Sequence, residues 1–190
     1  MRYKDDDKND KIVESAIQLI NEIGLAETSM SKIAKKAGVA PGTIYTYFDN
    51  KEDMLKSLFL IAKKDMQQKV LRGINISSPT ESEFKLLVRN FIHFFSNNKE
   101  NSLFMEQFMN SPLILKMDAD ESKILRSPIV EFFENGKSNA VFKQIDVDLM
   151  FIYAISPLTQ IAKKHYNGEF EFTEANVDTI VQMSWIAIRS

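Results

Sequence analysis

Apolar residues recur every three or four positions along nearly the whole chain after residue 9. This spacing puts them on one side of a helix, whereas the strict alternation typical of half-buried strands is brief everywhere. The pattern predicts an all-α fold of about nine helices. The expected helices span 12–23 (ending before Gly24), 30–37, Pro41–Phe48, Lys51–Arg72, Glu81–Ser96, Ser102–Asn110, Asp118–Asn135 (broken at Gly136), Val147–Tyr166 and Thr173–Arg189.

The first nine residues lie outside this pattern. Residues 3–8 are almost all charged and show no helical periodicity. Two interpretations stay open, a shortened epitope tag and a disordered arm native to the protein. On either interpretation, we expect residues 1–9 to stay outside the fold.

Residues 29–48 have the pattern of two short helices joined by a tight turn. Ser29 can cap the first helix with its hydroxyl oxygen, and Gly38 allows the left-handed backbone that the turn requires. Ile44 and Phe48 are expected to face the core. One face of the second helix is then left free, and it has small, hydroxyl-bearing and aromatic residues but no acid. These residues are Pro41, Gly42, Thr43, Tyr45, Thr46 and Tyr47.

A helix of this kind fits the major groove of double-stranded DNA. Threonine and tyrosine hydroxyls can bond to phosphates or base edges, and a helix N-terminus attracts phosphates through its free N–H groups. The residues expected to hold phosphates on either side are Ser29, Ser31 and Lys32, together with Lys51 at the start of the next helix.

The net charge of −2 alone argues against a nucleic-acid binder, but the charge is unevenly distributed. Residues 1–72 have 13 Lys/Arg against 11 Asp/Glu, and residues 73–190 have 11 against 15. The N-terminal third is therefore the part expected to touch DNA. Two alternatives stay open within it: Tyr45 could lie partly in the core, and Lys35 and Lys36 could form a solvated face.

The residues from 29 onward resemble the DNA-binding signature of the TetR/AcrR family of bacterial and archaeal regulators. The resemblance covers about Lys11 to Leu58 and is nearly free of gaps. Ser29 is a departure, since the family more often has threonine there, but the hydroxyl cap is kept. The matching residues are Ser29, Ile33-Ala34, Ala37-Gly38-Val39, the run Gly42–Phe48, Lys51-Glu52 and Leu55.

The resemblance implies a homodimer in which two such heads read a palindromic operator. It implies a DNA-binding domain at 10–55 and a ligand-binding and dimerisation domain at 56–190. We expect a repressor that a hydrophobic small molecule releases from DNA, with an activator still open because promoter position decides between them. The family's base and phosphate contacts fall here on Ser31, Pro41, Gly42, Thr43, Tyr45, Tyr47 and Lys51.

The middle of the chain is rich in phenylalanine and methionine. Such side chains line apolar pockets, and methionine adapts to ligands of different shape. The simpler alternative is that these residues form the core. The preferred pocket residues are Phe95, Phe104, Met105, Phe108 and Phe133.

The last two expected helices have apolar and small residues on more than one side, which is more than one core can bury. By analogy with the family, they pair with a second copy in a four-helix bundle around a two-fold axis. The expected interface residues are Ile152, Ile155, Thr159, Ile180, Met183 and Ala187.

Other protein classes fit less well. Without cysteine there are no disulfides or thiolate sites, and His93 and His165 have neither metal nor triad spacing, so we expect no enzyme, cofactor or metal. No apolar run approaches the ~20 residues of a membrane span and no signal pattern opens the chain, so we expect a cytoplasmic protein without a membrane partner. The rival interpretation is a helical ligand-binding or protein-interaction module whose DNA-binding head is not used.

Overall fold

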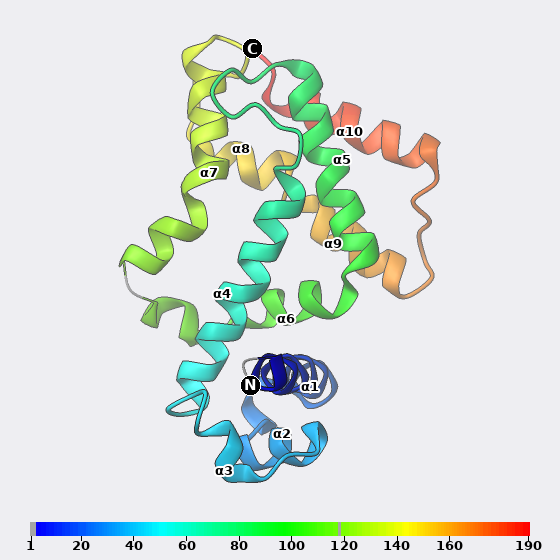
Figure 1. Ribbon diagram of the computed structural model, residues 1–190. Coiled ribbons are helices and arrows are strands. Elements are labelled where there is room, and N and C mark those ends of the chain that lie inside the picture. The colour runs from blue at the N-terminus through cyan, green and yellow to red at the C-terminus, as the bar shows by residue number, and fades with distance from the viewer. Residues whose placement is uncertain (1–2, 118) are drawn as a thin grey trace. The chain divides into compact units, whose positions relative to one another are not determined.

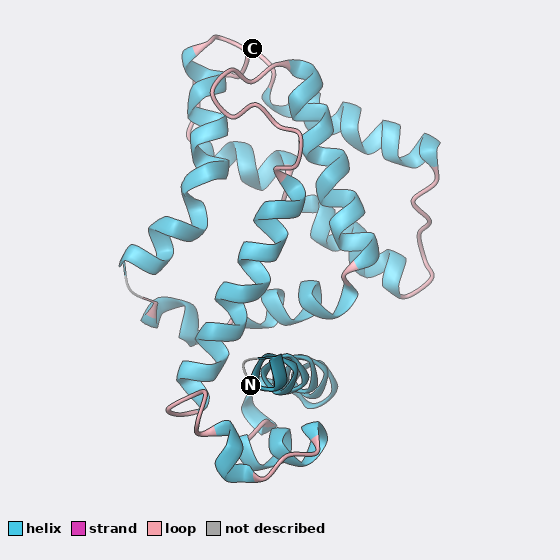
Figure 2. Cartoon of the chain, in the orientation of Figure 1, coloured by secondary structure: helices cyan, strands magenta, loops and turns pink. Residues whose placement is uncertain are grey.

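The computed structural model describes residues 3–117 and 119–190, and side chains for 8–117 and 128–190. The described chain is helical almost throughout (Figures 1 and 2), which confirms the all-α prediction. Asp118, where the seventh helix was expected to begin, lies outside the described residues. The elements are α1 (Tyr3–Glu27), α2 (Met30–Ala37), α3 (Pro41–Ile44), α4 (Lys51–Val70), α5 (Glu81–Asn97), α6 (Lys99–Met109), the 3-10 helix η1 (Pro112–Lys116), α7 (Ala119–Ser138), α8 (Val147–Ala154), α9 (Pro157–Tyr166) and α10 (Glu174–Ile188).

The chain forms two compact units. Unit 1 comprises Met1–Lys63 with Glu100–Ala119, and unit 2 comprises Lys64–Lys99 with Asp120–Ser190. Their limits differ from the domains expected at 10–55 and 56–190, because most of α6 and η1 pack with the N-terminal helices. The ring of Phe59 in α4, for example, stacks on Phe108 of α6 with 4.4 Å between centroids.

The first helix is longer at both ends than its apolar pattern predicts. It begins at Tyr3, so residues 3–9, expected outside the fold, extend α1. No glycine or proline lies between Tyr3 and Ile23, and adding residues to an existing helix costs little. Gly24 breaks the helix without ending it, since its φ of 81° and ψ of 162° interrupt α1 before the chain continues to Glu27.

The turn between α2 and α3 forms as the sequence predicts. The Ser29 hydroxyl oxygen accepts from the N–H of Lys32, and Gly38 has a left-handed φ of 67°. The helix expected over Pro41–Phe48, however, ends at Ile44. Beyond it the chain continues in tight turns, in which the N–H of Tyr47 donates to the Ile44 carbonyl at 3.0 Å. Residues 43–48 are β-branched or aromatic, and such residues favour the regular helix less than most.

An aromatic cluster forms the core of unit 2. Gly136 was expected to break the seventh helix, but α7 runs through it to Ser138. A Cβ at this position would lie 2.1 Å from two ring atoms of Phe142, so the absent side chain makes room for the ring. The buried rings around it are Phe84, Phe132, Phe133 and Trp185.

The helix expected over Val147–Tyr166 is two helices, α8 and α9, separated at residues 155 and 156. Pro157 causes the break, because its ring disfavours a helical residue before it and it has no N–H to donate. Ile155 lies at the break and turns into the core of unit 2, where it is 1% exposed.

Candidate nucleic-acid interface

Unit 1 presents the face of α3 and the following turn that the sequence predicts to be free. Ile44 and Phe48 are buried, which confirms that they face the core, and Ile33 of α2 is buried as well. Tyr45, whose place the sequence left open, is 55% exposed and therefore belongs to the surface. Pro41, Gly42 and Thr46 are exposed as well, and Thr43 and Tyr47 are half-buried.

The residues expected to flank this face lie at the starts of α2 and α4. Ser31 and Lys32 are exposed, whereas Ser29 and Lys51 are half-buried. The hydroxyl oxygen of Ser29 is already used as the cap of α2, and its distance to the Lys32 nitrogen is 3.3 Å. α4 is capped by Asn50, whose side-chain oxygen accepts from the N–H of Asp53 at 3.0 Å. Both helix starts therefore have a side-chain cap.

The first turn of α4 is also tied to η1. Lys116 donates to Glu52 at 2.7 Å, and Lys56 lies 3.6 Å from the same carboxylate. The hydrogen bond from Lys116 holds the pKa of Glu52 below its ordinary value, with the charges of Lys116 and Lys56 acting in the same direction. The carboxylate of Glu52 is therefore paired with two lysines within unit 1.

Contacts between α1 and α6 were missed from the sequence, because nothing in the local pattern pairs residues about 80 positions apart. Asn21 donates to a carboxylate oxygen of Glu100 at 2.6 Å. Gln107 in turn donates to the side chain of Asn21 at 3.2 Å and to the Ile20 carbonyl at 3.4 Å. These polar contacts make α6 part of the same unit as the helix-turn-helix.

The five expected pocket residues are all buried, and they are divided between the two units. Phe104, Met105 and Phe108 belong to unit 1, and Phe95 and Phe133 belong to unit 2. Phe95 packs on Phe91 and Phe94, whereas Phe133 packs on Phe84, Phe132 and Phe142.

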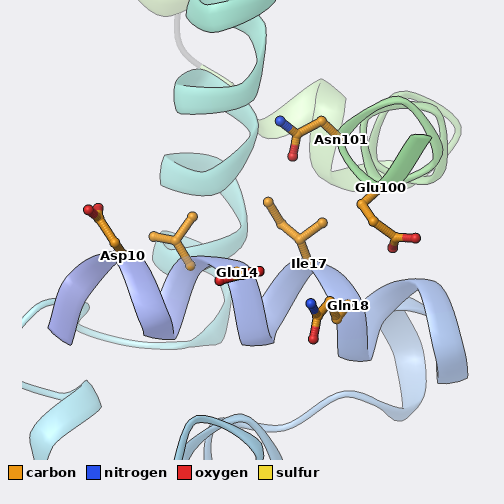
Figure 3. Close-up of a pocket in the computed structure, with 7 residues that line it drawn as sticks. Asp10, Glu14, Ile17, Gln18, Glu100 and Asn101 are labelled. Atoms are coloured by element: carbon orange, nitrogen blue, oxygen red, sulfur yellow. The ribbon is translucent and has the colours of Figure 1, made fainter. Parts of the chain in front are cut away.

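An open groove of about 280 Å³ lies in unit 1 and involves none of these residues. Figure 3 shows Ile17 pointing from α1 toward the first turn of α6, where Glu100 and Asn101 lie. The other residues that line the groove are Asp10, Val13, Glu14 and Gln18.

The expected dimer residues separate into two groups in unit 2. Ile155 and Ile180 are buried in the core of unit 2. Ile152 and Met183 are exposed, and Thr159 and Ala187 are half-buried. Three further exposed apolar residues lie on α8 and α10, and the sequence does not single them out because helical spacing alone does not say which side faces the core. They are Leu149, Tyr153 and Ile186.

The described parts of the chain contain neither a candidate metal site nor a candidate membrane-crossing helix. Residues 8–117 and 128–190 contain no group of histidine or acidic side chains arranged to hold a metal ion. In the same part of the chain, no helix is both long and apolar enough to cross a membrane.

Two family models match the chain. The model for bacterial regulatory proteins of the tetR family matches residues 12–58, and the model for a tetracyclin repressor-like C-terminal domain matches residues 79–189. The first therefore covers the helix-turn-helix described above, and the second covers more than half of the chain.

Individual proteins are similar to this chain over different parts of its length. The fatty acid metabolism regulator protein of Bacillus subtilis (strain 168) is 57% identical over 49 residues, which are 26% of this chain and 25% of that protein. An uncharacterized HTH-type transcriptional regulator of Haemophilus influenzae is 22% identical over 189 residues and 100% of both chains. A crystal structure of a TetR family transcription regulator from Marinobacter aquaeolei VT8 has the same fold, with a TM-score of 0.89 at 22% identity over 100% of both chains.

The matched ranges agree with the structure, because the helix-turn-helix lies within 12–58 and the helices α5 to α10 lie within 79–189. The chain belongs to the TetR family of transcriptional regulators.

Proposed function

We propose that this regulator is a homodimeric repressor that reads a palindromic operator and is released from it by a hydrophobic small molecule. One observation carries the proposal: the exposed face of α3 and its following turn has hydroxyl and aromatic groups and no acid, on a buried frame. Tyr45 and Thr46 are its most accessible polar groups. DNA phosphates repel carboxylates, and hydroxyl groups suit both phosphates and base edges.

The operator contacts follow from this face. Thr43, Tyr45, Thr46 and Tyr47 enter the major groove, while Pro41 and Gly42 let the helix start approach the backbone closely. The phosphate contacts on either side come from Ser31, Lys32 and Lys51, with Ser29 fixing the start of α2.

The partner in the dimer is a second copy that covers the exposed apolar face of α8 and α10. Tyr153 and Met183 are each 67% exposed. Large apolar side chains gathered on two neighbouring helices are typical of an interface. Ile152 of α8 and Ile186 of α10 are exposed on the same two helices. The half-buried Thr159 of α9 and Ala187 of α10 are the other candidate contacts.

Release by an effector is a shift between two arrangements of the dimer. The two helix-turn-helix units of a dimer reach successive major grooves only when they are roughly 34–36 Å apart. A ligand that binds more tightly to a dimer with a different separation favours the form that is free of DNA. α4 supports this mechanism, since one continuous helix contributes residues to both units. The effector is hydrophobic, and its candidate contacts remain Phe95, Phe104, Met105, Phe108 and Phe133.

The test is a DNA selection on the purified protein, followed by operator titration at two salt concentrations. A palindromic site should emerge, and affinity should fall steeply with salt because each neutralised phosphate contributes about −0.9 to the slope of log K against log salt. Tyr45→Ala should weaken operator binding about 5- to 150-fold, equivalent to about 1–3 kcal/mol. Leu115→Ala, which truncates an exposed residue elsewhere in unit 1, is the control.

Each result separates the interpretations. Full operator affinity in Tyr45→Ala would remove this residue from the contact surface. If no sequence is enriched and DNA binding does not depend on salt, the helix-turn-helix is not used to bind DNA. The chain would then be a helical ligand-binding or protein-interaction module.

A further inference from the structure

The C-terminal end of α1 is held by side chains from outside the helix. The last carbonyls of a helix have no N–H partner within it. Because Gly24 breaks α1, the three residues that follow form a short separate piece of backbone. The Thr28 hydroxyl, in a side chain that is almost fully buried, donates back to the Gly24 carbonyl at 2.8 Å.

Two lysines complete this arrangement. Lys32 of α2 donates to the Glu27 carbonyl at 2.7 Å, and Lys51 of α4 donates to the Ala26 carbonyl at 3.2 Å. A cation at a helix C-terminus is favourable, because the unpaired carbonyls there have partial negative charge. The two lysines therefore connect α1 to the start of α2 and to the start of α4.

The same two lysines flank the proposed DNA-binding face. A lysine ammonium has three N–H donors, and the α1 carbonyl occupies one of them in each case. A free lysine has a long flexible stem, so fixing its ammonium on a carbonyl restricts where the remaining donors point. One ammonium can then bridge a carbonyl of α1 and a phosphate of DNA.

We propose that Lys32 and Lys51 are positioning residues that hold the end of α1 and, from that anchored position, bind DNA phosphates. The inference rests on the proposed DNA binding and adds a consequence to it. Operator binding should order the segment after Gly24, because the phosphate and the α1 carbonyl share one cation. A lysine that only neutralised phosphate charge would leave that segment unchanged.

The experiment is hydrogen–deuterium exchange of the peptide covering residues 24–28, with and without operator DNA, in Lys32→Gln and Lys51→Gln. Two matched controls come from α2: Lys35→Gln removes an exposed charge, and Lys36→Gln removes the link to Glu22 of α1 at 2.7 Å. Without DNA, the two test variants should exchange faster at this peptide than both controls. Operator DNA should slow exchange there in the wild type, and less in either test variant.

Salt titration gives the second readout, which a purely structural role would not move. Each test variant should lower the slope of log K against log salt by about one, the contribution of one phosphate. Exchange in the test variants equal to the controls, or no effect of operator on this peptide in the wild type, would overturn the inference. A wild-type protein that binds no DNA overturns the proposed function instead, and exchange without DNA then still supports or refutes the hold on α1.

Discussion

The substitution Gly136→Ala tests whether tertiary packing, and not helix preference, determines this position. Gly136 lies inside α7, where alanine would ordinarily stabilise the helix by about 1 kcal/mol. The added methyl group would lie 2.1, 2.1 and 2.9 Å from three atoms of the Phe142 ring. Ordinary carbon contacts are about 3.5–4.0 Å, so the ring or the helix would have to move by more than 1 Å.

The surroundings of Phe142 leave the ring little space. Its centroid lies between 5.7 and 6.3 Å from those of four neighbouring rings, and the side chain is fully buried. Overpacking costs about 1–3 kcal/mol, and contacts this short around a ring with little free space place Gly136→Ala in the upper part of that range, at about 2–3 kcal/mol. After the helix gain of about 1 kcal/mol, we expect a net loss of about 1–2 kcal/mol in the free energy of unfolding. The melting temperature should fall by about 2–8 °C.

Urea unfolding followed by the fluorescence of Trp185 measures this loss. Trp185 is the single tryptophan of the chain, and its ring centroid lies 6.3 Å from that of Phe142. Gly42→Ala is the control, because no described atom lies within 4 Å of a Cβ there. In a Phe142→Leu background the added methyl group should cost less, giving a coupling energy of about 1 kcal/mol. A Gly136→Ala protein as stable as the wild type would refute the packing argument.

Two further predictions concern the proposed dimer and the pKa of a carboxylate. Tyr153→Glu and Met183→Glu should each shift the protein from dimer to monomer in light scattering, whereas the control Leu115→Glu in unit 1 should not. If Tyr153→Glu and Met183→Glu both remain dimers, the α8–α10 face is not the interface. Lys116→Met should raise the pKa of Glu52 in an NMR titration, because the hydrogen bond from Lys116 lowers that pKa in the folded protein. The Glu52–Lys116 pair therefore stabilises the fold at pH values above the pKa of Glu52 in the unfolded chain. This stabilisation is lost as the pH falls through the pKa of Glu52 in the folded protein. An unchanged pKa would show that this contact is absent in solution.

The helices and the helix-turn-helix could be predicted because local signals determine them. The spacing of apolar residues, the Ser29 cap and the left-handed Gly38 each act within a few residues of sequence. Pro157 marks the break between α8 and α9, but apolar residues continue on both sides of it, so their spacing predicts one helix where the structure has two. Proline in such a pattern deserves more weight than continuity of the apolar face.

What the sequence could not determine depends on contacts between distant residues. Gly136 reads as a helix end by composition, and only the ring of Phe142 explains why α7 continues through it. Tyr153 and Ile155 lie two residues apart and both have large hydrophobic side chains, yet Ile155 is in the core and Tyr153 is on the surface. The buried phenylalanines present the same difficulty, since apolar character alone does not distinguish a pocket wall from a core.

In the helix-turn-helix, the residues that form the core are different from those proposed to contact DNA. Burial of Ile33, Ile44 and Phe48 fixes the angle between α2 and α3, so these positions are constrained by packing whatever the operator is. Tyr45 and Thr46 are exposed, and folding places little demand on their identity. On the proposed function, a change of operator preference therefore requires no change in the buried residues. Lys32 and Lys51 contact α1 and are also proposed to bind phosphates, so both roles constrain them.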